Sequence, residues 1–284
     1  MSVKIVVDST ADLAASIRHR FTVVPLSILF GDDEYLDGVT ISHEEFYQKL
    51  VESDVLPTTS QASPGQFMET FQSLVEDGHD VVCITVSGKL SGTAQSASMA
   101  AESFPGRVFV VDSNTIAIGL GILAEYALSL VDKGLSALEV AVAVEKERES
   151  VRLIAMVDTL EYLQKGGRLS KAAAIAGGIL SIKPVLSIED GEIKVLGKAR
   201  GSKQGNNLLI QKIKEAGGVD FEKPILLGYT GLTDVYLKKY IKDSASVWED
   251  ARNELQYEII GSVVGTHAGP GAIAAAFFAA DPQK

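Results

Sequence analysis

Residues 81–103 read VVCITVSGKLSGTAQSASMAAES, and this stretch predicts a strand, a loop and a helix in immediate succession. The apolar, β-branched run at 81–86 is typical of a buried strand, and the Ala-rich run at 92–103 is typical of a helix. The same strand–helix order recurs on both sides of this stretch. Strands that alternate with helices indicate a parallel sheet with helices on both faces, so we expect an α/β fold.

The first half of the chain contains four such strands. They are expected at 3–7, 21–26, 81–86 and 108–111, with helices at 8–20, 42–53, 63–78, 92–103 and 116–133. Two of these helices have clear start signals, because Ser42 and Glu45 match a capping box and Ser63 directly precedes Pro64. We therefore expect a parallel-sheet α/β domain over residues 1–152.

The pattern changes in the second half. Residues 187–195, SIEDGEIKV, place Asp190-Gly191 between two alternating runs, which predicts a β-hairpin. Further strands are expected at 153–157, 225–229 and 258–264, and helices at 234–242 and 272–279. This mixture predicts an α+β domain over residues 153–284, whose last helix is a candidate to pack back on the first domain.

Composition limits the function classes. The chain has 284 residues, of which 46% are hydrophobic, so it can fold around a core without metal or disulfides. Its 26 Lys and Arg against 37 Asp and Glu give a net charge of −11, which argues against nucleic acid or an anionic membrane as the main partner. The single cysteine, Cys83, is expected in the core, and the four histidines lack metal-ligand spacing, so no metal site is expected.

The N-terminal sequence MSVKIVVDSTADL lacks the pattern of a signal peptide. The apolar runs at 172–180 and 272–280 are too short to span a bilayer. We therefore expect a cytoplasmic protein without stable membrane insertion.

Hydroxyl and carboxylate side chains follow three of the predicted strands. They lie in Asp8-Ser9-Thr10, in SGKLSGT at 87–93, and in Asp112-Ser113. Ligands of parallel α/β sheets bind beyond the carboxyl ends of the strands, although Asp and Ser at such places also cap helices. The SGKLSGT loop directly precedes a predicted helix, where an anion is favoured, but it matches neither a P-loop nor a dinucleotide fingerprint.

Three further loops carry candidate polar groups. PTTSQASPG at 57–65 is rich in hydroxyls, YLQKGGRLS at 162–170 holds Lys165 and Arg168, and THAGPGA at 266–272 holds His267. Each also fits an ordinary solvated or structural loop. Ser91 and His267 are candidates for a nucleophile–base pair, although the G-x-S-x-G elbow of α/β-hydrolases is absent.

Taken together, these segments resemble the DegV family of bacterial fatty-acid-binding proteins, the binding subunits of fatty acid kinases. The matching pieces are VDSTADL at 7–13, TTSQASPGQF at 58–67, SGKLSGTAQSA at 87–97, VVDS at 110–113, YLQKGGRLS at 162–170, IKPVLSIEDG at 182–191 and GTHAGPGA at 265–272. The sequence departs from the family pattern at Ala62, where the family favours Pro after the Gln of TSQ. This substitution removes no side chain that can form a hydrogen bond.

The resemblance implies a two-domain, EDD-type fold with an apolar tunnel between the domains for one long-chain fatty acid. It implies that Thr59 and Ser91 hold the carboxylate and that His267 and Arg168 lie near it. It assigns no role to Lys165, Lys183 or Arg200. Supporting or neighbouring positions are Ser60, Gln61, Gly92, Thr93, Asp8 and Ser9.

The resemblance also implies a carrier without a cofactor or catalytic residues of its own. Such a carrier presents the fatty acid to a separate ATP-dependent kinase, and the acyl-phosphate then feeds phospholipid synthesis through an acyltransferase. Two other classes stay open from the residues alone. They are a small-molecule hydrolase that uses Ser91 and His267, and a sensor of a small molecule.

Overall fold

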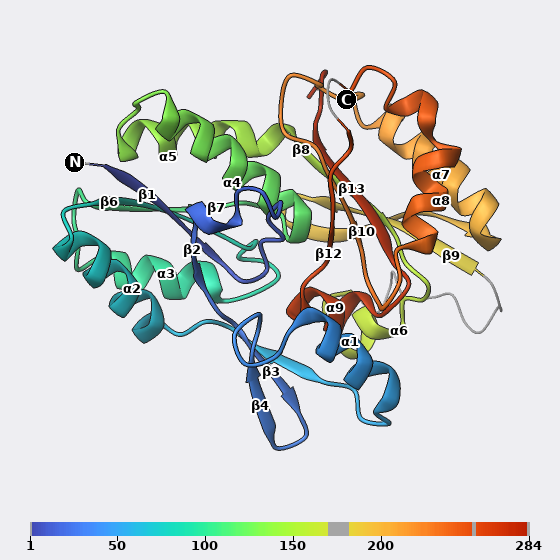
Figure 1. Cartoon of the computed structure of the whole chain (residues 1–284), viewed down its shortest axis with the longest axis horizontal. Helices are drawn as coiled ribbons and strands as arrows, with labels where there is room; N and C mark the ends of the chain where they lie inside the picture. The colour runs from blue at the N-terminus through green and yellow to red at the C-terminus, as the bar shows by residue number, and fades with distance from the viewer. Residues whose placement is uncertain (1, 170–181, 252–253, 283–284) are drawn as a thin grey trace.

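The computed structural model describes residues 2–169, 182–251 and 254–282 (Figure 1). Its first half contains a four-stranded sheet in the order β2-β1-β6-β7, in which every neighbouring pair is parallel. The strands are β1 (Val3–Asp8), β2 (Thr22–Val24), β6 (Asp80–Thr85) and β7 (Val108–Asp112). The parallel α/β arrangement predicted from the strand–helix alternation is therefore confirmed.

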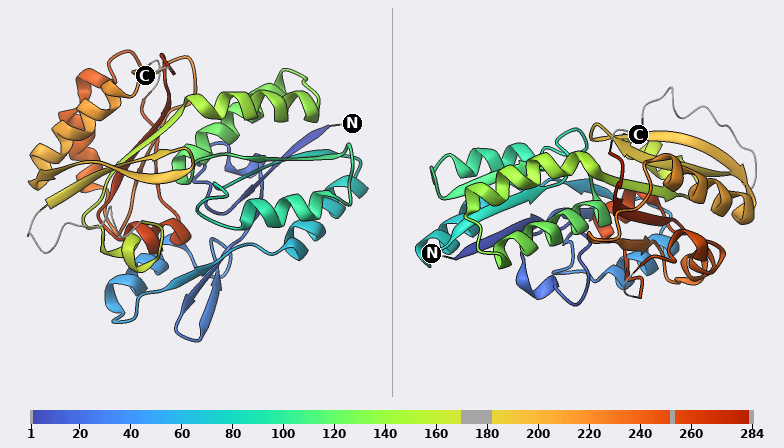
Figure 2. Two further views of the ribbon diagram at one scale, coloured as in Figure 1. Left: turned by 180° about the vertical axis from the view of Figure 1, so that it is seen from behind. Right: turned by 90° about the horizontal axis from the view of Figure 1, so that it is seen from above.

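Helices cover both faces of this sheet (Figures 1 and 2). One face packs against α2 (Pro64–Glu76) and α3 (Thr93–Ala101), and the other against α4 (Ala117–Asp132) and α5 (Ala137–Glu147). Alternate residues of β6 divide between the two cores, since Val81 and Cys83 face the first pair of helices and Val82 and Ile84 face the second. Cys83 is buried in this core, as predicted.

Helix starts follow the predicted signals. Helix α1 (His43–Glu52) begins with the capping box of Ser42 and Glu45, and α2 begins with Ser63 and Pro64. Helix α5 has a further capping box that the sequence analysis missed, formed by Ser136 and Glu139.

The second half contains a six-stranded sheet in the order β10-β9-β8-β13-β11-β12. Only β11 and β12 pair in parallel, and the other neighbours are antiparallel. The strands are β8 (Val151–Met156), β9 (Ile182–Glu189), β10 (Glu192–Arg200), β11 (Leu226–Tyr229), β12 (Tyr257–Ile259) and β13 (Ile273–Phe278). The helices among the described residues of this half are α6 (Glu161–Lys165), α7 (Gly201–Glu215), α8 (Val235–Asp243) and α9 (Ser262–Ala268). Short 3-10 turns lie at Arg18–Arg20 and Arg148–Ser150 in the first half and at Ala245–Val247 in the second.

The hairpin predicted at Asp190-Gly191 is confirmed as the turn between β9 and β10. Both residues have positive φ, 49° and 76°, as a two-residue type I′ turn requires. The sequence analysis missed α7 and a small antiparallel sheet in the order β4-β3-β5. The strands of that sheet are β3 (Ser27–Phe30), β4 (Asp33–Leu36) and β5 (Thr58–Ser60).

The helix predicted at 8–20 is wrong except for the 3-10 turn at its end. Asp8 accepts hydrogen bonds from the backbone N–H and the hydroxyl of Thr10, at 2.9 and 2.6 Å. Short polar side chains that bond to nearby backbone in this way compete with helix formation. The segment therefore forms turns that carry the chain from β1 to β2.

The helix predicted at 272–279 is also wrong, because this segment is strand β13. All six residues of β13 are buried, and the strand pairs with β8 on one side and β11 on the other. Burial on both faces removes the periodicity that separates helix from strand, and the high helix propensity of Ala is overridden by sheet pairing. The last regular element is therefore a central strand rather than a helix that returns to the first domain.

The strand predicted at 258–264 is correct only at its start. Strand β12 ends at Ile259, and α9 begins at Ser262. The apolar run at 172–180 lies outside the described residues. Within the described ranges, no helix is long and apolar enough to cross a membrane.

Helix α4 packs between the two larger sheets. Its buried residues share one core with Val7 and Ile84 of the parallel sheet and with Ala274 and Phe278 of β13. The predicted domain boundary at 152/153 falls within β8 and stays a prediction.

The close packing of α4 gives a stability prediction. A Cβ on Gly121 would lie 2.0 Å from the backbone carbonyl oxygen of Asp12, so Gly121→Ala must push α4 away from the segment after β1. We expect a loss of about 1–3 kcal/mol in the free energy of unfolding, measured by urea denaturation. Gly65→Ala in α2 is the matched control, since its Cβ would meet no atom nearer than 3.8 Å. Equal stability of Gly121→Ala and the parent would contradict the prediction.

Candidate functional site

An apolar cavity lies where the carboxyl ends of β1 and β6 meet the six-stranded sheet. It contains about 970 Å³ of empty space, counting the part open to solvent. Its apolar walls come from both halves of the chain and include Leu26, Val86, Ile116, Leu153, Ala155, Val157, Leu163, Leu186, Ile188, Ile193, Val263 and Ala274.

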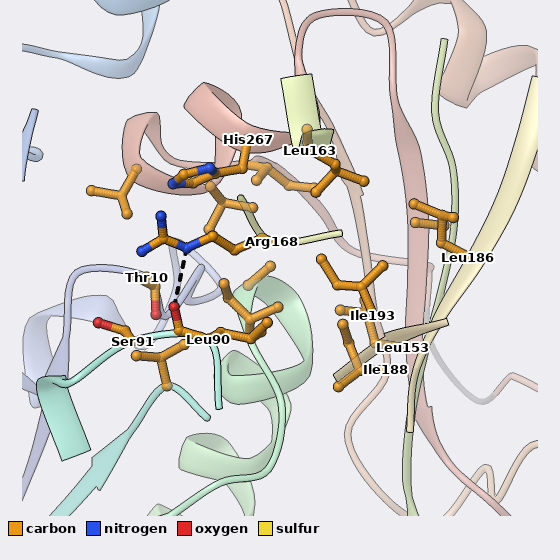
Figure 3. Close-up of a pocket in the computed structure, with 18 of the residues that line it drawn as sticks. Thr10, Leu90, Ser91, Leu153, Leu163, Arg168, Leu186, Ile188, Ile193 and His267 are labelled. Atoms are coloured by element: carbon orange, nitrogen blue, oxygen red, sulfur yellow. Dashed lines mark hydrogen bonds between the residues drawn. The ribbon is translucent and has the colours of Figure 1, made fainter. Parts of the chain in front are cut away.

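Polar side chains gather at one end of the cavity, as Figure 3 shows. Thr59, Ser91, Arg168 and His267 all line it and form what we call the polar end. They come from β5, the loop before α3, the loop after α6, and α9. The structure therefore brings together the four residues that the resemblance assigns to a carboxylate.

The hydrogen bonds of the polar end fix its side chains. Thr59 Oγ1 lies 2.9 Å from His267 Nε2. Ser91 Oγ lies 2.9 Å from Thr93 Oγ1 and accepts a hydrogen bond from the Thr93 N–H at 3.3 Å. Arg168 donates to the backbone carbonyls of Leu90 and Gly166, at 3.2 and 2.8 Å. The guanidinium is thus anchored to the loop that carries Ser91 (Figure 3).

Burial, together with the smaller effect of the nearby charge of Arg168, lowers the pKa of His267 from its usual 6.5 to about 4. The imidazole is therefore neutral at pH 7. Its Nδ1 is buried and has no hydrogen-bond partner among the described residues.

Two buried carboxylates hold the helix that carries His267. Asp12 Oδ1 accepts a hydrogen bond from the N–H of Gly261 at 2.7 Å, and Asp37 Oδ1 accepts one from Ser262 at 3.2 Å. These are first N–H groups of α9, which otherwise lack a helical partner. Burial, followed by the nearby charge of Asp37, raises the pKa of Asp12 well above its usual range.

The supporting residues divide into two groups. Ser60 and Gln61 line the cavity, whereas Asp8, Ser9, Gly92 and Thr93 do not. The Gln61 amide packs on Gly92, where a Cβ would lie 2.0 Å from Gln61 Oε1, and donates to Ser96 Oγ at 3.0 Å. A Cβ at position 92 would therefore force the Gln61 amide, the end of a flexible side chain, to move.

The side chains of Asp8 and Ser9 accept hydrogen bonds from backbone N–H groups. Asp8 Oδ2 accepts a hydrogen bond from the N–H of Val86 at 2.7 Å, which ties β1 to the loop after β6. Ser9 Oγ accepts one from the N–H of Leu26 at 3.1 Å. Both residues hold the walls of the cavity without lining it.

Three cations from family-like segments lie outside the cavity lining. Lys165 pairs with Glu161 at 2.6 Å, and both side chains are more than half exposed. Lys183 forms an ion pair with Asp158, and Arg200 is exposed at the end of β10. Ser170, at the end of the YLQKGGRLS motif, lies outside the described residues.

The sequence analysis placed Thr10 among the polar groups after the first strand but gave it no role, and the structure places it in the cavity lining. The analysis missed Asp12 and Asp37. Asp12 and Asp37 act through α9, and no local pattern links them to a helix more than two hundred residues later.

Ser91 and His267, the candidate nucleophile and base, do not bond to each other in the structure. His267 Nε2 faces Thr59, while the Ser91 hydroxyl faces Thr93. Among the described residues, no group of three or more His, Cys, Asp or Glu could hold a metal ion. Hydroxyls, a neutral imidazole and one guanidinium beside an apolar cavity suit an amphipathic anion.

Comparison with known proteins gives one consistent family. The family model described as "Uncharacterised protein, DegV family" matches residues 2–280. A DegV domain-containing protein of Caldanaerobacter subterraneus is 37% identical over 282 residues, which cover 97% of this chain and 98% of that protein.

Two solved structures share the whole fold. A DegV family protein from Thermus thermophilus, described as binding fatty acid, is 32% identical with a TM-score of 0.86, over 98% of this chain and 100% of that one. A stearic-acid-binding protein from Eubacterium ventriosum is 30% identical with a TM-score of 0.84, over 98% of both chains. The family model and these relatives cover nearly the whole length, and the chain belongs to the DegV family.

Proposed function

We propose that this chain binds one long-chain fatty acid, with the tail in the apolar cavity and the carboxylate at the polar end. The observation that carries the proposal is a largely apolar cavity with a cluster of hydrogen-bonding side chains at one end. The fatty-acid-binding descriptions of the proteins from Thermus thermophilus and Eubacterium ventriosum support it.

The tail supplies most of the affinity in this account. At about 0.8 kcal/mol for each buried CH₂, a tail of about 14 methylenes contributes roughly 11 kcal/mol before the cost of immobilisation. The head group needs enough hydrogen bonds to offset the loss of water around a carboxylate. Thr59, Ser91 and the neutral His267 can supply these bonds, and Arg168 supplies a positive charge.

The proposal extends to a carrier role without catalysis of its own. The carrier would present the carboxylate to a separate ATP-dependent fatty acid kinase in the cytoplasm, and the acyl-phosphate would feed phospholipid synthesis through an acyltransferase. The resemblance of the motifs supports this part. Hydroxyl and imidazole donors suit it, because they leave a carboxylate oxygen more nucleophilic than a bidentate Arg grip would. The hydrogen bond of His267 to Thr59, rather than to Ser91, favours the carrier over a Ser91–His267 hydrolase.

The direct test is denaturing extraction of the purified protein, followed by mass spectrometry of the lipids. Near-stoichiometric fatty acid, or its uptake from added palmitate or oleate, is the expected result. Ester hydrolysis by the protein alone, with no fatty acid retained or taken up, would move the assignment to the hydrolase. The proposed presentation to a kinase has its own test. Acyl-phosphate, detected by trapping with hydroxylamine, should form only when ATP and a fatty acid kinase subunit are both added to the loaded protein.

Removal of the Ser91 hydroxyl tests the head group. We expect Ser91→Ala to weaken fatty-acid binding about ten- to a hundredfold, because a hydrogen bond to a charged group contributes about 1.5–3 kcal/mol. Acyl-phosphate formation with the kinase should fall as well. Ser98→Ala is the matched control, since Ser98 is exposed on α3 and bonds to the Ala94 carbonyl. Unchanged affinity in Ser91→Ala, measured by titration calorimetry, would remove Ser91 from the head-group site.

The pKa of His267 reports where the carboxylate lies. A negative charge beside the imidazole stabilises its protonated form, so bound oleate should raise this pKa above the value of about 4 in the empty protein. Proton NMR titration of the empty and loaded protein measures both values. In the empty protein, the lowered pKa destabilises the fold as pH falls from about 6.5 towards 4, where the unfolded chain binds more protons. An identical His267 pKa in both states would place the carboxylate elsewhere.

A further inference from the structure

The apolar cavity has a polar neighbour. A second cleft shares three lining residues with it, Leu153, Ser187 and Ile188, which we call the end wall. On the far side, the cleft is lined by charges of both signs, from Arg148, Glu149, Arg152, Glu189, Asp190, Lys212 and Glu215. One thin set of side chains therefore separates an apolar space from a charged one.

The end wall lies where the sheet opens. Strands β8 and β9 pair only through Ile154, Ala155 and Met156, opposite Ser187, Leu186 and Val185. Leu153 and Ile188 are the next residues on each strand, and they lie beyond the paired region. Side chains rather than backbone hydrogen bonds therefore close the cavity at this point.

The β9–β10 hairpin accounts for the separation of β8 and β9 at the end wall. Its turn reaches the first half of the chain, where the Gly191 carbonyl accepts a hydrogen bond from Ser87 Oγ at 2.8 Å. Strand β9 is thereby anchored away from the start of β8. Ser187 turns its hydroxyl to Glu189 at 2.7 Å, which leaves Leu153 and Ile188 as the apolar part of the wall.

The end wall lies at the tail end of the cavity. In Figure 3, Leu153 and Ile188 lie across the cavity from Ser91, Arg168 and His267. We propose that Leu153 and Ile188 set the upper limit of acyl chain length, by stopping the terminal methyl group in front of the charged cleft. This rests on the proposed fatty-acid binding. A chain too long for the cavity would have to displace the wall and extend into a charged, hydrated cleft.

Two isoleucines allow a matched test. Ile188 and Ile193 are directly opposite each other in the β9–β10 ladder, are both partly buried, and both line the apolar cavity. Only Ile188 also lines the charged cleft. Both substitutions to Ala remove the same atoms, but only Ile188→Ala opens the wall.

The experiment loads delipidated protein with an equimolar series of saturated acids from myristate to docosanoate, then extracts and quantifies the bound acids. We expect the parent to show a sharp upper limit. Ile188→Ala should raise the ratio of the acids above this limit to the preferred acid roughly tenfold or more, because steric exclusion is relieved. Ile193→Ala should keep the parent's limit. Ile188→Ala should also gain binding of an acid with a terminal hydroxyl group that exceeds the limit, since its polar end can reach the cleft.

The outcomes separate the two proposals. A parent that takes up no acid at all contradicts fatty-acid binding itself. A parent that loads normally, while both alanine variants change the limit equally or neither changes it, contradicts the end wall. Ile188→Phe covers the case in which Ile188→Ala does not fold, and it should move the limit to shorter acids. Longer acids in Ile188→Phe would equally overturn the inference.

Discussion

Two buried carboxylates, Asp12 and Asp37, hold the start of α9, and the geometry of the polar end depends on that contact. Both residues come from the first half of the chain, whereas α9 follows strand β12 in the second half. His267 lies in the last turn of this short helix and meets Thr59 of β5. The polar end is therefore assembled from both halves, and its side chains meet only when α9 is docked.

Burying the two carboxyl groups of Asp12 and Asp37 costs free energy, because part of each group has no hydrogen-bond partner. Oδ2 of both Asp12 and Asp37 is buried without a partner among the described residues. Free N–H groups at a helix start carry partial positive charge, so they compensate a buried carboxylate better than an apolar neighbour would. Polar groups at the cavity are also kept neutral or hydrogen-bonded: burial keeps His267 neutral, and backbone carbonyls accept hydrogen bonds from Arg168. A carboxylate entering the polar end would then meet donors that are already oriented.

Much of the fold could be predicted from the sequence where local signals and tertiary packing agree. The starts of α1 and α2 and the Asp190-Gly191 turn are of this kind, because each satisfies its own backbone within a few residues. The prediction failed at β13, where an Ala-rich run is buried on both faces, and at residues 8–20, where side chains bond to the backbone instead. The cavity-lining Thr59, Ser91, Arg168 and His267 were found through motifs. Asp12, Asp37 and the end wall were not, because their roles arise from contacts between distant segments.

The central claim is the orientation of one acyl chain in the cavity. A crystal structure of the protein loaded with a long-chain fatty acid brominated at its terminal carbon tests it directly, since anomalous scattering locates the bromine. The account predicts the bromine beside Leu153 and Ile188, and the carboxylate within hydrogen-bond distance of Thr59 and Ser91. Bromine at the His267 end, or an acid bound in the charged cleft with the apolar cavity empty, would contradict it.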